Sequence, residues 1–262
     1  MDAGTPALSR GLAVLRALAA HPEGLSAAEL AGQVETPRAT LYRILRTLVG
    51  EGFARATPGA GGRYSLGAAA RALGAPAGES PDLAASARPI MEALAARLGE
   101  TVKLVVREGL EAVTLAVAIP RREACIASRL GNRLPLHVGV SQRLLLAHAP
   151  EAVRRAVLAG PLAKVTGRTV TSRSRLARDL VSLAGVTDHA GHGEGVEGVG
   201  ATAALVGSPG REPAAALVAV YVHASQGALR LRAIRTGVVE AAAAITRALD
   251  PSDAGTTPIP GR

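Results

Sequence analysis

A run of basic and hydroxyl-bearing residues between positions 38 and 46 has the chemistry of a DNA-contacting surface. An arginine guanidinium can pair bidentately with a phosphate or with the O6 and N7 atoms of guanine, and side-chain hydroxyls can bond to either. No acidic residue occurs from Arg38 to Gly50, whereas ordinary surface helices mix charges of both signs. The alternative is a basic surface helix in a chain with many arginines. We expect DNA contacts from Arg38, Ala39, Thr40, Tyr42, Arg43 and Arg46, with Arg43 the best candidate for reading a guanine.

These side chains need a helix that presents them together, and the sequence from Pro37 to Leu48 predicts one. Its apolar residues recur at the i, i+3, i+4, i+7 spacing, which leaves the arginines on the opposite face. Thr36 is expected to cap this helix, with Pro37 at the first helical position, where a missing N–H costs no hydrogen bond. The apolar positions are Leu41, Ile44, Leu45 and Leu48.

A shorter helix directly precedes this one. Ser26 and Glu29 have the spacing of a capping box, and Leu30 follows on the inner face. Only two residues separate the two helices, which is typical of a helix-turn-helix. A further helix is expected over residues 9–20.

Two β-prone runs follow the basic helix and predict a wing. Residues 52–56 and 63–66 flank a segment rich in glycine, which indicates a hairpin. Arg55 and Arg63 would then bracket the phosphate backbone or enter the minor groove beside the recognition helix.

The composition limits the class of protein and its partners. The chain has 262 residues with 48% apolar residues and a formal charge of +9, so it is long enough for two domains and favours a polyanionic partner. Aromatic residues make up only 2%, which argues against modules that stack single-stranded RNA on aromatic side chains. The single cysteine, Cys125, excludes an internal disulfide. We expect no membrane span, no cofactor and a cytoplasmic location.

The excess positive charge lies mainly outside the basic helix. Residues 121–178 hold twelve basic and two acidic residues, a net charge of +10. One hypothesis is that Arg129, Arg133 or Arg143 meets an anionic effector such as an organic acid. The alternative is a solvated surface or a face between subunits.

The chain beyond residue 66 predicts an α+β domain, because helical and strand-like periods alternate without an internal repeat. A Pro- and Gly-rich segment at 74–81 indicates a linker. We expect helices at 67–73, 82–98, 142–149, 151–158, 173–183 and 228–249, and strands at 101–106, 112–119, 125–128, 201–206 and 214–223.

The N-terminal motifs resemble those of the IclR-type transcription regulators of bacteria. Ala39 departs from the family, which commonly has serine there. The resemblance implies a winged helix-turn-helix domain over 1–73, a linker and linker helix over 74–98, a GAF-like effector-binding domain over 99–249 with an antiparallel sheet flanked by helices, and a disordered tail over 250–262. The matching segments are Ser9-Arg10-Gly11-Leu12, Gly24-Leu25-Ser26, Glu29-Leu30-Ala31, Pro37-Arg38-x-Thr40-x-Tyr42-Arg43-Ile44-Leu45 and Arg63-Tyr64-Ser65-Leu66-Gly67.

The resemblance also implies an effector pocket in the second domain. The segment 131–137 looks like the family's approach to that pocket, whereas the residues after His137 depart from the family pattern. Tyr221 and His223 stand where the family commonly has serines, so the resemblance does not favour a bulky or aromatic ligand. The expected effector contacts are Val140, Ser141, His192, Ala201, Tyr221 and His223.

Other chemistry is less well supported by the spacing of the residues. His189, His192 and Glu194 lie close in sequence, but the interleaved glycines indicate a loop near the pocket mouth rather than a metal site. Cys125 is expected to be an inert, buried thiol. No nucleophile elbow, Walker loop or dinucleotide fingerprint occurs in the sequence. We therefore expect no catalytic residues.

The resulting prediction is a transcription regulator that binds a pseudo-palindromic operator as a homodimer or tetramer and responds to a small-molecule effector. Repression is favoured over activation. The helix from Asp82 and the segment 76–81 are the expected lever between the two domains. The alternatives are a small-molecule-binding α+β enzyme and a basic protein that binds DNA without sequence preference.

Overall fold

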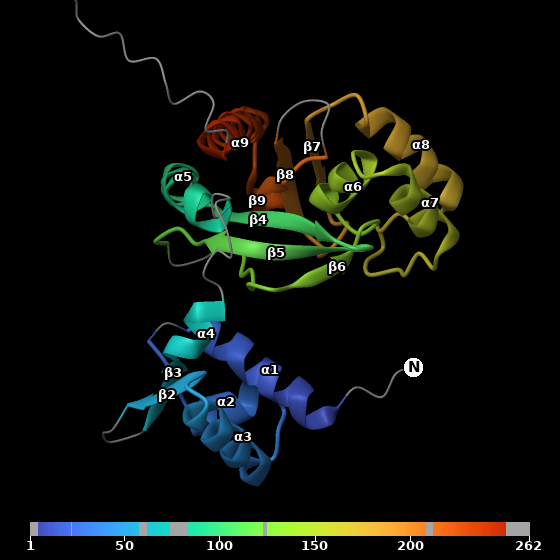
Figure 1. Cartoon of the computed structure of the whole chain (residues 1–262). Coiled ribbons are helices and arrows are strands. Elements are labelled where there is room, and N and C mark those ends of the chain that lie inside the picture. Colours follow the sequence, from blue (N-terminus) through green and yellow to red (C-terminus); the bar gives the residue numbers. More distant parts are fainter. Residues whose placement is uncertain are drawn as a thin grey trace, which may run out of the picture. The chain divides into compact units, whose positions relative to one another are not determined.

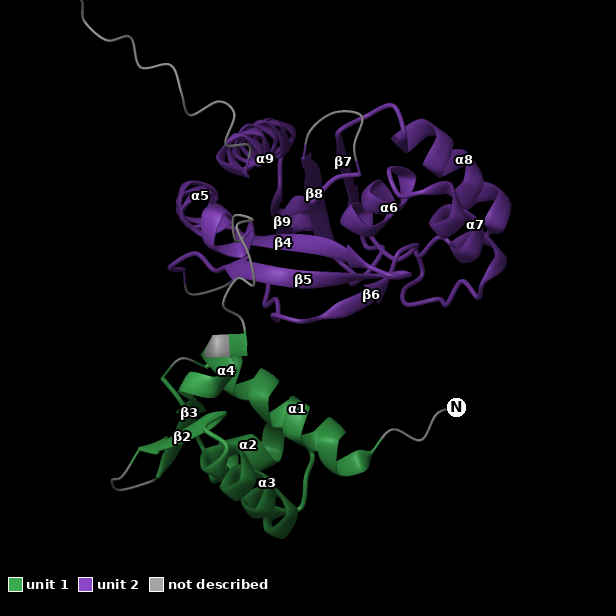
Figure 2. Cartoon of the chain, in the orientation of Figure 1, with its two compact units in different colours: residues 1–80 green, residues 81–262 purple. Residues whose placement is uncertain are grey.

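The structure is a computed structural model that describes residues 5–21, 23–57, 62–73, 83–122, 125–207 and 212–249. The chain forms two compact units, residues 1–80 and 81–262 (Figure 2). The predicted linker at 74–81 and the predicted disordered tail at 250–262 lie outside the described residues.

The first unit combines short helices with a small antiparallel sheet (Figure 1). The sheet has the strand order β1-β3-β2, in which β1 adds to the predicted wing hairpin. Its core joins side chains of α1, α2 and α3, among which Val14, Leu30, Leu41 and Leu45 are buried. The elements are α1 (Pro6–Ala19), β1 (Leu25–Ser26), α2 (Ala27–Gln33), α3 (Arg38–Gly50), β2 (Ala54–Thr57), β3 (Arg63–Leu66) and α4 (Ala68–Leu73).

The turn between α2 and α3 follows the sequence prediction with one correction. The capping box is present, because the Glu29 amide donates to Ser26 Oγ and the Ser26 amide donates to the Glu29 carboxylate. Thr36, however, does not cap α3. Its buried hydroxyl donates to the Val34 carbonyl, and the helix begins at Arg38 with Pro37 as the flanking residue. Thr36 therefore stabilises the turn rather than the end of the helix.

The second unit is built on a six-stranded antiparallel sheet with the order β6-β5-β4-β9-β8-β7. This arrangement confirms the predicted α+β class. Its elements are α5 (Leu83–Leu98), β4 (Thr101–Glu108), β5 (Glu111–Ala118), β6 (Arg133–Pro135), α6 (Val140–Ala147), α7 (Glu151–Ala159), α8 (Arg173–Leu183), β7 (Asp188–His192), β8 (Val199–Val206), β9 (Ala215–Val222), the 3-10 turn η1 (His223–Ser225) and α9 (Ala228–Leu249).

Helices cover both faces of this sheet, and each face has its own core. Helices α5 and α9 lie side by side on one face, and α6, α7 and α8 belong to the other (Figure 1). Because side chains alternate along a strand, odd-numbered positions of β9 such as Leu217 face α5 and α9, whereas Val218 and Val220 face α6. The expected linker helix, α5, thus packs its apolar side into the core of the second unit through Met91 and Leu94.

Two strand predictions and one burial prediction in the second unit are wrong. The third strand is β6, and residues 125–129 have no regular secondary structure. The segment 188–192 is an edge strand paired with β8, not a loop. Cys125 is exposed rather than buried. Both strands are short, and neither Arg133–Pro135 nor Asp188–His192 contains a β-branched residue, so the sequence shows no strand-like pattern there.

Candidate DNA-binding helix and effector pocket

The outer face of α3 carries the side chains predicted to contact DNA. Leu41 and Leu45 are buried beneath it, so the helix is held by its opposite side. Tyr42 is 55% exposed, Arg38, Ala39, Arg43 and Arg46 are exposed, and Thr40 is half-buried. Among the described residues, none of the three arginine guanidinium groups on this face has a hydrogen bond or an ion pair. These groups are free to meet an external anion.

The two wing arginines differ in their environment. Arg55 on β2 is exposed and makes no side-chain hydrogen bond or ion pair within the described part of the chain. Arg63 Nη2 donates to the Gly24 carbonyl at 2.7 Å and lies 3.7 Å from Glu29 Oε2. Arg63 therefore ties the wing to the start of α2, whereas Arg55 remains available at the surface.

The second unit contains a pocket of about 290 Å³ on the α6 face of its sheet. Its walls come from the first turn of α6, from the ends of β4, β8 and β9, and from the segments 126–134 and 191–196. Of the six residues predicted to contact an effector, Val140, Ser141, His192 and Ala201 line this pocket. Apolar side chains such as Val218 and Val220 form much of the remaining surface. A partly open, mainly apolar hollow with a few polar groups is typical of small-molecule sites.

Tyr221 and His223 do not line this pocket; together with His192 and Arg235 they line a separate hollow beside α9, and their role as effector contacts stays a prediction. Tyr221 faces α5 and α9, where its hydroxyl lies 3.1 Å from Thr202 Oγ1. Its ring lies over Gly200, where an added Cβ would be only 2.1 Å from the ring. Tyr221 lies on the opposite face of β9 from Val218 and Val220, because side chains alternate along a strand. The argument against a bulky or aromatic ligand, which required Tyr221 and His223 in the pocket, therefore does not apply to the α6-face pocket.

His223 instead stacks on the back of a pocket residue. Its ring is parallel to that of His192, with centroids 3.8 Å apart and an interplanar angle of 4°. His192 also contacts the guanidinium of Arg168 through Nε2. Burial lowers the pKa of His192, and the neighbouring His223 and Arg168 lower it further. His192 is thus stabilised as a neutral imidazole.

The three arginines proposed for an anionic effector have different environments. Arg129 lines the pocket. Arg133 lies at the sheet edge, where it pairs with Glu108 and Glu111. Arg143 is only 6% exposed and is fully engaged inside the protein. Only Arg129 is placed to meet a ligand in the pocket.

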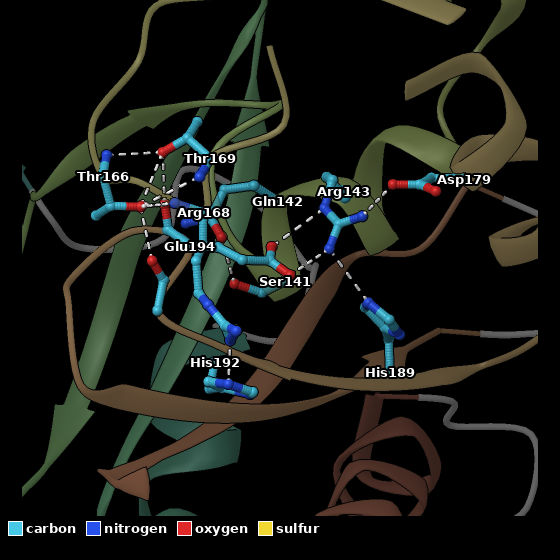
Figure 3. Close-up of polar contacts among 11 residues, drawn as sticks. Ser141, Gln142, Arg143, Thr166, Arg168, Thr169, Asp179, His189, His192 and Glu194 are labelled. Atoms are coloured by element: carbon cyan, nitrogen blue, oxygen red, sulfur yellow. Dashed lines mark hydrogen bonds and ion pairs between the residues drawn. The ribbon is translucent and has the colours of Figure 1, made fainter. Parts of the chain in front are cut away.

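The Arg143 guanidinium organises a buried polar network beside the pocket (Figure 3). Its Nη1 donates to Asp179 Oδ2 at 2.7 Å, and its Nη2 and Nε donate to the two carboxylate oxygens of Glu194 at 2.5 and 3.2 Å. Burial and the nearby Arg143 lower the pKa of His189, which lies 3.4 Å from Nη2. The network links α6, α8 and the segment after β7.

A second set of bonds fixes the backbone around Glu194. Thr166 Oγ1 donates to the Gly193 carbonyl at 2.6 Å, and Thr169 Oγ1 donates to the Glu194 carbonyl at 2.9 Å (Figure 3). Both threonines are buried. The segment 166–169 thus holds the pocket wall formed by residues 193–194 in place. In the described residues, no three His, Cys, Asp or Glu side chains converge as metal ligands.

Sequence reasoning missed one charged residue of the pocket, Lys103. It lies on β4 at a position that pairs with Val218, and its side chain lines the pocket. Burial lowers the pKa of its ammonium. The signal in the sequence was a single lysine within the apolar run 102–106, at the alternate position that faces α6.

Comparison with known protein families assigns both units. Residues 7–58 match the family model described as the IclR helix-turn-helix domain, and residues 77–247 match that of the bacterial transcriptional regulator IclR C-terminal domain. The chain belongs to the IclR family. It is therefore a transcriptional regulator with a helix-turn-helix DNA-binding domain and a C-terminal effector-binding domain.

Individual members of the IclR family resemble the chain over most of its length. The HTH-type transcriptional regulator Rv1719 of Mycobacterium tuberculosis is 32% identical over 76% of this chain and 76% of its own. The HTH-type transcriptional repressor AllR of Escherichia coli K12 is 29% identical over 68% of this chain and 65% of its own. The crystal structure of an IclR homologue from Microbacterium hydrocarbonoxydans, complexed with 4-hydroxybenzoate, has 27% identity and a TM-score of 0.69, and it covers 94% of this chain and 100% of its own.

None of the described helices of this IclR-family chain is both long enough and apolar enough to cross a membrane.

Proposed function

We propose that this IclR-family regulator is a repressor that binds a pseudo-palindromic operator as a homodimer and is controlled by an organic acid in the α6-face pocket. The observation that carries the DNA-binding part is the outer face of α3, where three exposed arginine side chains have no partner among the described residues. An unpaired cationic face on a helix that follows a tight turn suits insertion into the major groove. Repression is supported by the relative AllR, which is named as a transcriptional repressor.

The exposure of the α3 residues is the basis for assigning some of them to bases and others to phosphates. Arg43 lies near the middle of the exposed face and is assigned to a guanine, while Arg38 and Arg46 are assigned to flanking phosphates. Ala39 is exposed beside the start of the helix and can approach a base or a thymine methyl group. Thr40 and Tyr42 add polar contacts, and Arg55 of the wing contacts the backbone outside the major groove.

The proposed dimer sets the geometry of the operator. Two copies related by a two-fold axis present two α3 helices to half-sites separated by whole turns of DNA, so the operator is inverted about its centre. A tetramer would use the same half-sites in two pairs.

The proposed effector occupies the pocket that Val140, Ser141, His192 and Ala201 line. The volume of about 290 Å³ suits a small ligand, and the solved IclR homologue with 4-hydroxybenzoate supports an organic acid. Control requires that the ligand bind the DNA-competent and DNA-incompetent states unequally. The protein uses no cofactor, catalyses no reaction and acts on DNA in the cytoplasm.

Selection of DNA ligands tests this proposal directly. The purified full chain would be incubated with a pool of random duplexes, and the bound fraction would be sequenced over successive rounds. We expect enrichment of an inverted repeat with half-sites one helical turn, or a multiple of it, apart. A variant with Arg38, Arg43 and Arg46 changed to alanine should enrich nothing. Failure of the wild-type protein to enrich any sequence would refute the sequence-specific regulator.

A further inference from the structure

We propose that Lys103 is the specificity-determining residue of the pocket, where its ammonium pairs with the oxyanion of a small monocarboxylate that has an apolar body. This inference rests on the proposed function, in which the pocket holds the effector.

The position of Lys103 in the sheet directs its side chain into the pocket. On β4, Lys103 pairs with Val218 and Thr101 pairs with Val220, and both valines line the pocket. The next residue on the same face, Val105, belongs to the core beneath α6. Lys103 is therefore the cation that the central strands of the sheet place in the apolar floor of the pocket.

Lys103 has no counter-ion among the residues that the structure describes. No carboxylate or carbonyl of the described residues forms an ion pair or a hydrogen bond with its Nζ atom. The acid that shares the pocket, Glu194, has both carboxylate oxygens bonded to Arg143. Burying a cation without a partner is costly, and the pKa of Lys103 is accordingly lowered by burial. The site is complete only when a ligand supplies the anion.

The other charged and titratable groups of the pocket leave it positive. They are Arg129, His192 and Glu194. Arg143 neutralises Glu194, and His192 is stabilised as a neutral imidazole by burial, by His223 and by Arg168. Lys103 and the exposed Arg129 remain as uncompensated cations within the described residues. A single carboxylate at Lys103 satisfies the buried charge, and Arg129 provides long-range attraction at the surface.

The apolar side chains in the remaining walls of the pocket favour a ligand with an apolar body. Val140, Ala201, Val218 and Val220 surround the space next to Lys103 and offer no hydrogen bonds from their side chains. A volume of about 290 Å³ limits the ligand to a small acid. Because burial lowers the pKa of Lys103, a bound carboxylate should raise that pKa again, so binding is accompanied by proton uptake at any pH where the free ammonium is partly deprotonated.

The chain offers a matched control, because Lys103 and Lys164 are its only lysines. Lys164 is exposed and lies outside the pocket. Substituting Lys103→Met keeps an unbranched side chain only one heavy atom shorter and removes the charge from a half-buried position, so this variant should fold and should unfold at the same or a higher temperature than the wild type. Lys164→Met controls for loss of one surface charge.

The test uses a series of straight-chain and aromatic monocarboxylates, including benzoate, together with the matching carboxamides. Binding to the wild type, Lys103→Met and Lys164→Met would be measured by calorimetry, and the two lysine Cε signals of 13C-lysine-labelled protein would be followed by NMR. We expect at least one carboxylate to bind the wild type and Lys164→Met and to shift only the Lys103 signal. Its affinity for Lys103→Met should fall about 30-fold or more, as expected for a buried charge that loses its partner. The matching carboxamide should not discriminate between the proteins.

Three results would overturn the proposal: equal carboxylate binding to Lys103→Met, carboxamide binding to the wild type as tight as carboxylate binding, or no binding of any carboxylate in the series. Operator binding is measured on the same samples. If carboxylates bind Lys103→Met as tightly as the wild type while operator binding is intact, only the proposed anion site is refuted. Absence of operator binding refutes the proposed function.

Discussion

At the scale of single residues, the two units use arginine in opposite ways. Arg43 and Arg46 of α3 are exposed and have no partner among the described residues, whereas Arg143 of α6 is buried between two carboxylates. A buried guanidinium needs its partners, because an isolated buried charge is strongly destabilising. The exposed arginines contribute little to folding and are therefore available for binding.

Arg43→Ala should weaken operator binding by about 1–3 kcal/mol and relax the preference at one base pair of each half-site. Its side chain is exposed and lacks internal contacts, so the melting temperature should not change. Competition binding with operators mutated at single positions measures the effect. Arg178→Ala, on the exposed side of α8, removes the same charge far from α3 in sequence and should leave binding unchanged. A uniform loss across all operator variants would instead make Arg43 a phosphate contact.

The sequence predicted some residues of the α3 face and of the pocket and missed others, and the reason differs from residue to residue. The α3 face was predictable because helical periodicity separates Leu41 and Leu45 from the arginines. Val140, Ser141, His192 and Ala201 were suggested by the family resemblance, and they line one pocket. Tyr221 and His223, suggested in the same way, line a separate hollow with His192, because Tyr221 lies on the other face of β9. Lys103 was missed because a single lysine within the apolar run 102–106 does not show by itself which face of the strand borders a pocket.

At the scale of elements, helices followed the sequence closely and short edge strands did not. The closing helix α9 and the helix α8 have the predicted bounds, because each repeats its apolar spacing over several turns. Strands β6 and β7 have only three and five residues and contain no β-branched residue, although β7 pairs with the next strand, β8. Such short segments show no strand-like pattern in the sequence.

The junction between the wing and α3 depends on one close backbone contact. A Cβ added at Gly67 would lie 2.0 Å from the Gly52 carbonyl oxygen, and the Gly67 amide donates to the Phe53 carbonyl at 2.8 Å. Gly67→Ala should therefore destabilise the first unit by about 1–3 kcal/mol, the usual cost of overpacking. Denaturant unfolding followed by circular dichroism measures this change.

Gly11→Ala is the matched control for this substitution. Gly11 lies inside α1, and an added Cβ there would meet nothing within 4 Å. Alanine is favoured over glycine in a helix, so this variant should be stabilised by roughly 0.5–1 kcal/mol. Equal changes in the free energy of unfolding for the two variants would show that the close contact at Gly67 does not determine the stability of the first unit.

At the scale of the whole molecule, the Arg143 network makes stability depend on pH. The pKa of His189 is lowered by burial and by Arg143, and that of His192 is lowered by burial, His223 and Arg168. The unfolded chain therefore binds protons more readily than the folded chain just below the ordinary histidine pKa of about 6.5. The free energy of unfolding should be constant above that pH and should fall as the pH drops below it, until the lowered pKa values are passed.

Thermal unfolding of the wild type and of His189→Gln between pH 5 and 8 measures this dependence. The variant removes one of the two titrating groups, so its melting temperature should fall less steeply with decreasing pH. A steeper fall in the variant would mean that protonated His189 stabilises the folded state and would contradict the assigned direction.

The molecule joins a DNA-reading unit to an effector-binding unit, and binding to DNA is the property on which its regulatory function depends. The most direct measurement is the fluorescence anisotropy of a labelled duplex from upstream of the protein's own gene, compared with a scrambled duplex, over a range of salt concentrations. We predict that preference for the upstream duplex persists as salt rises, with a log–log slope of about −0.9 per neutralised phosphate. Equal affinity for both duplexes, lost in parallel as salt increases, would contradict sequence-specific recognition by α3.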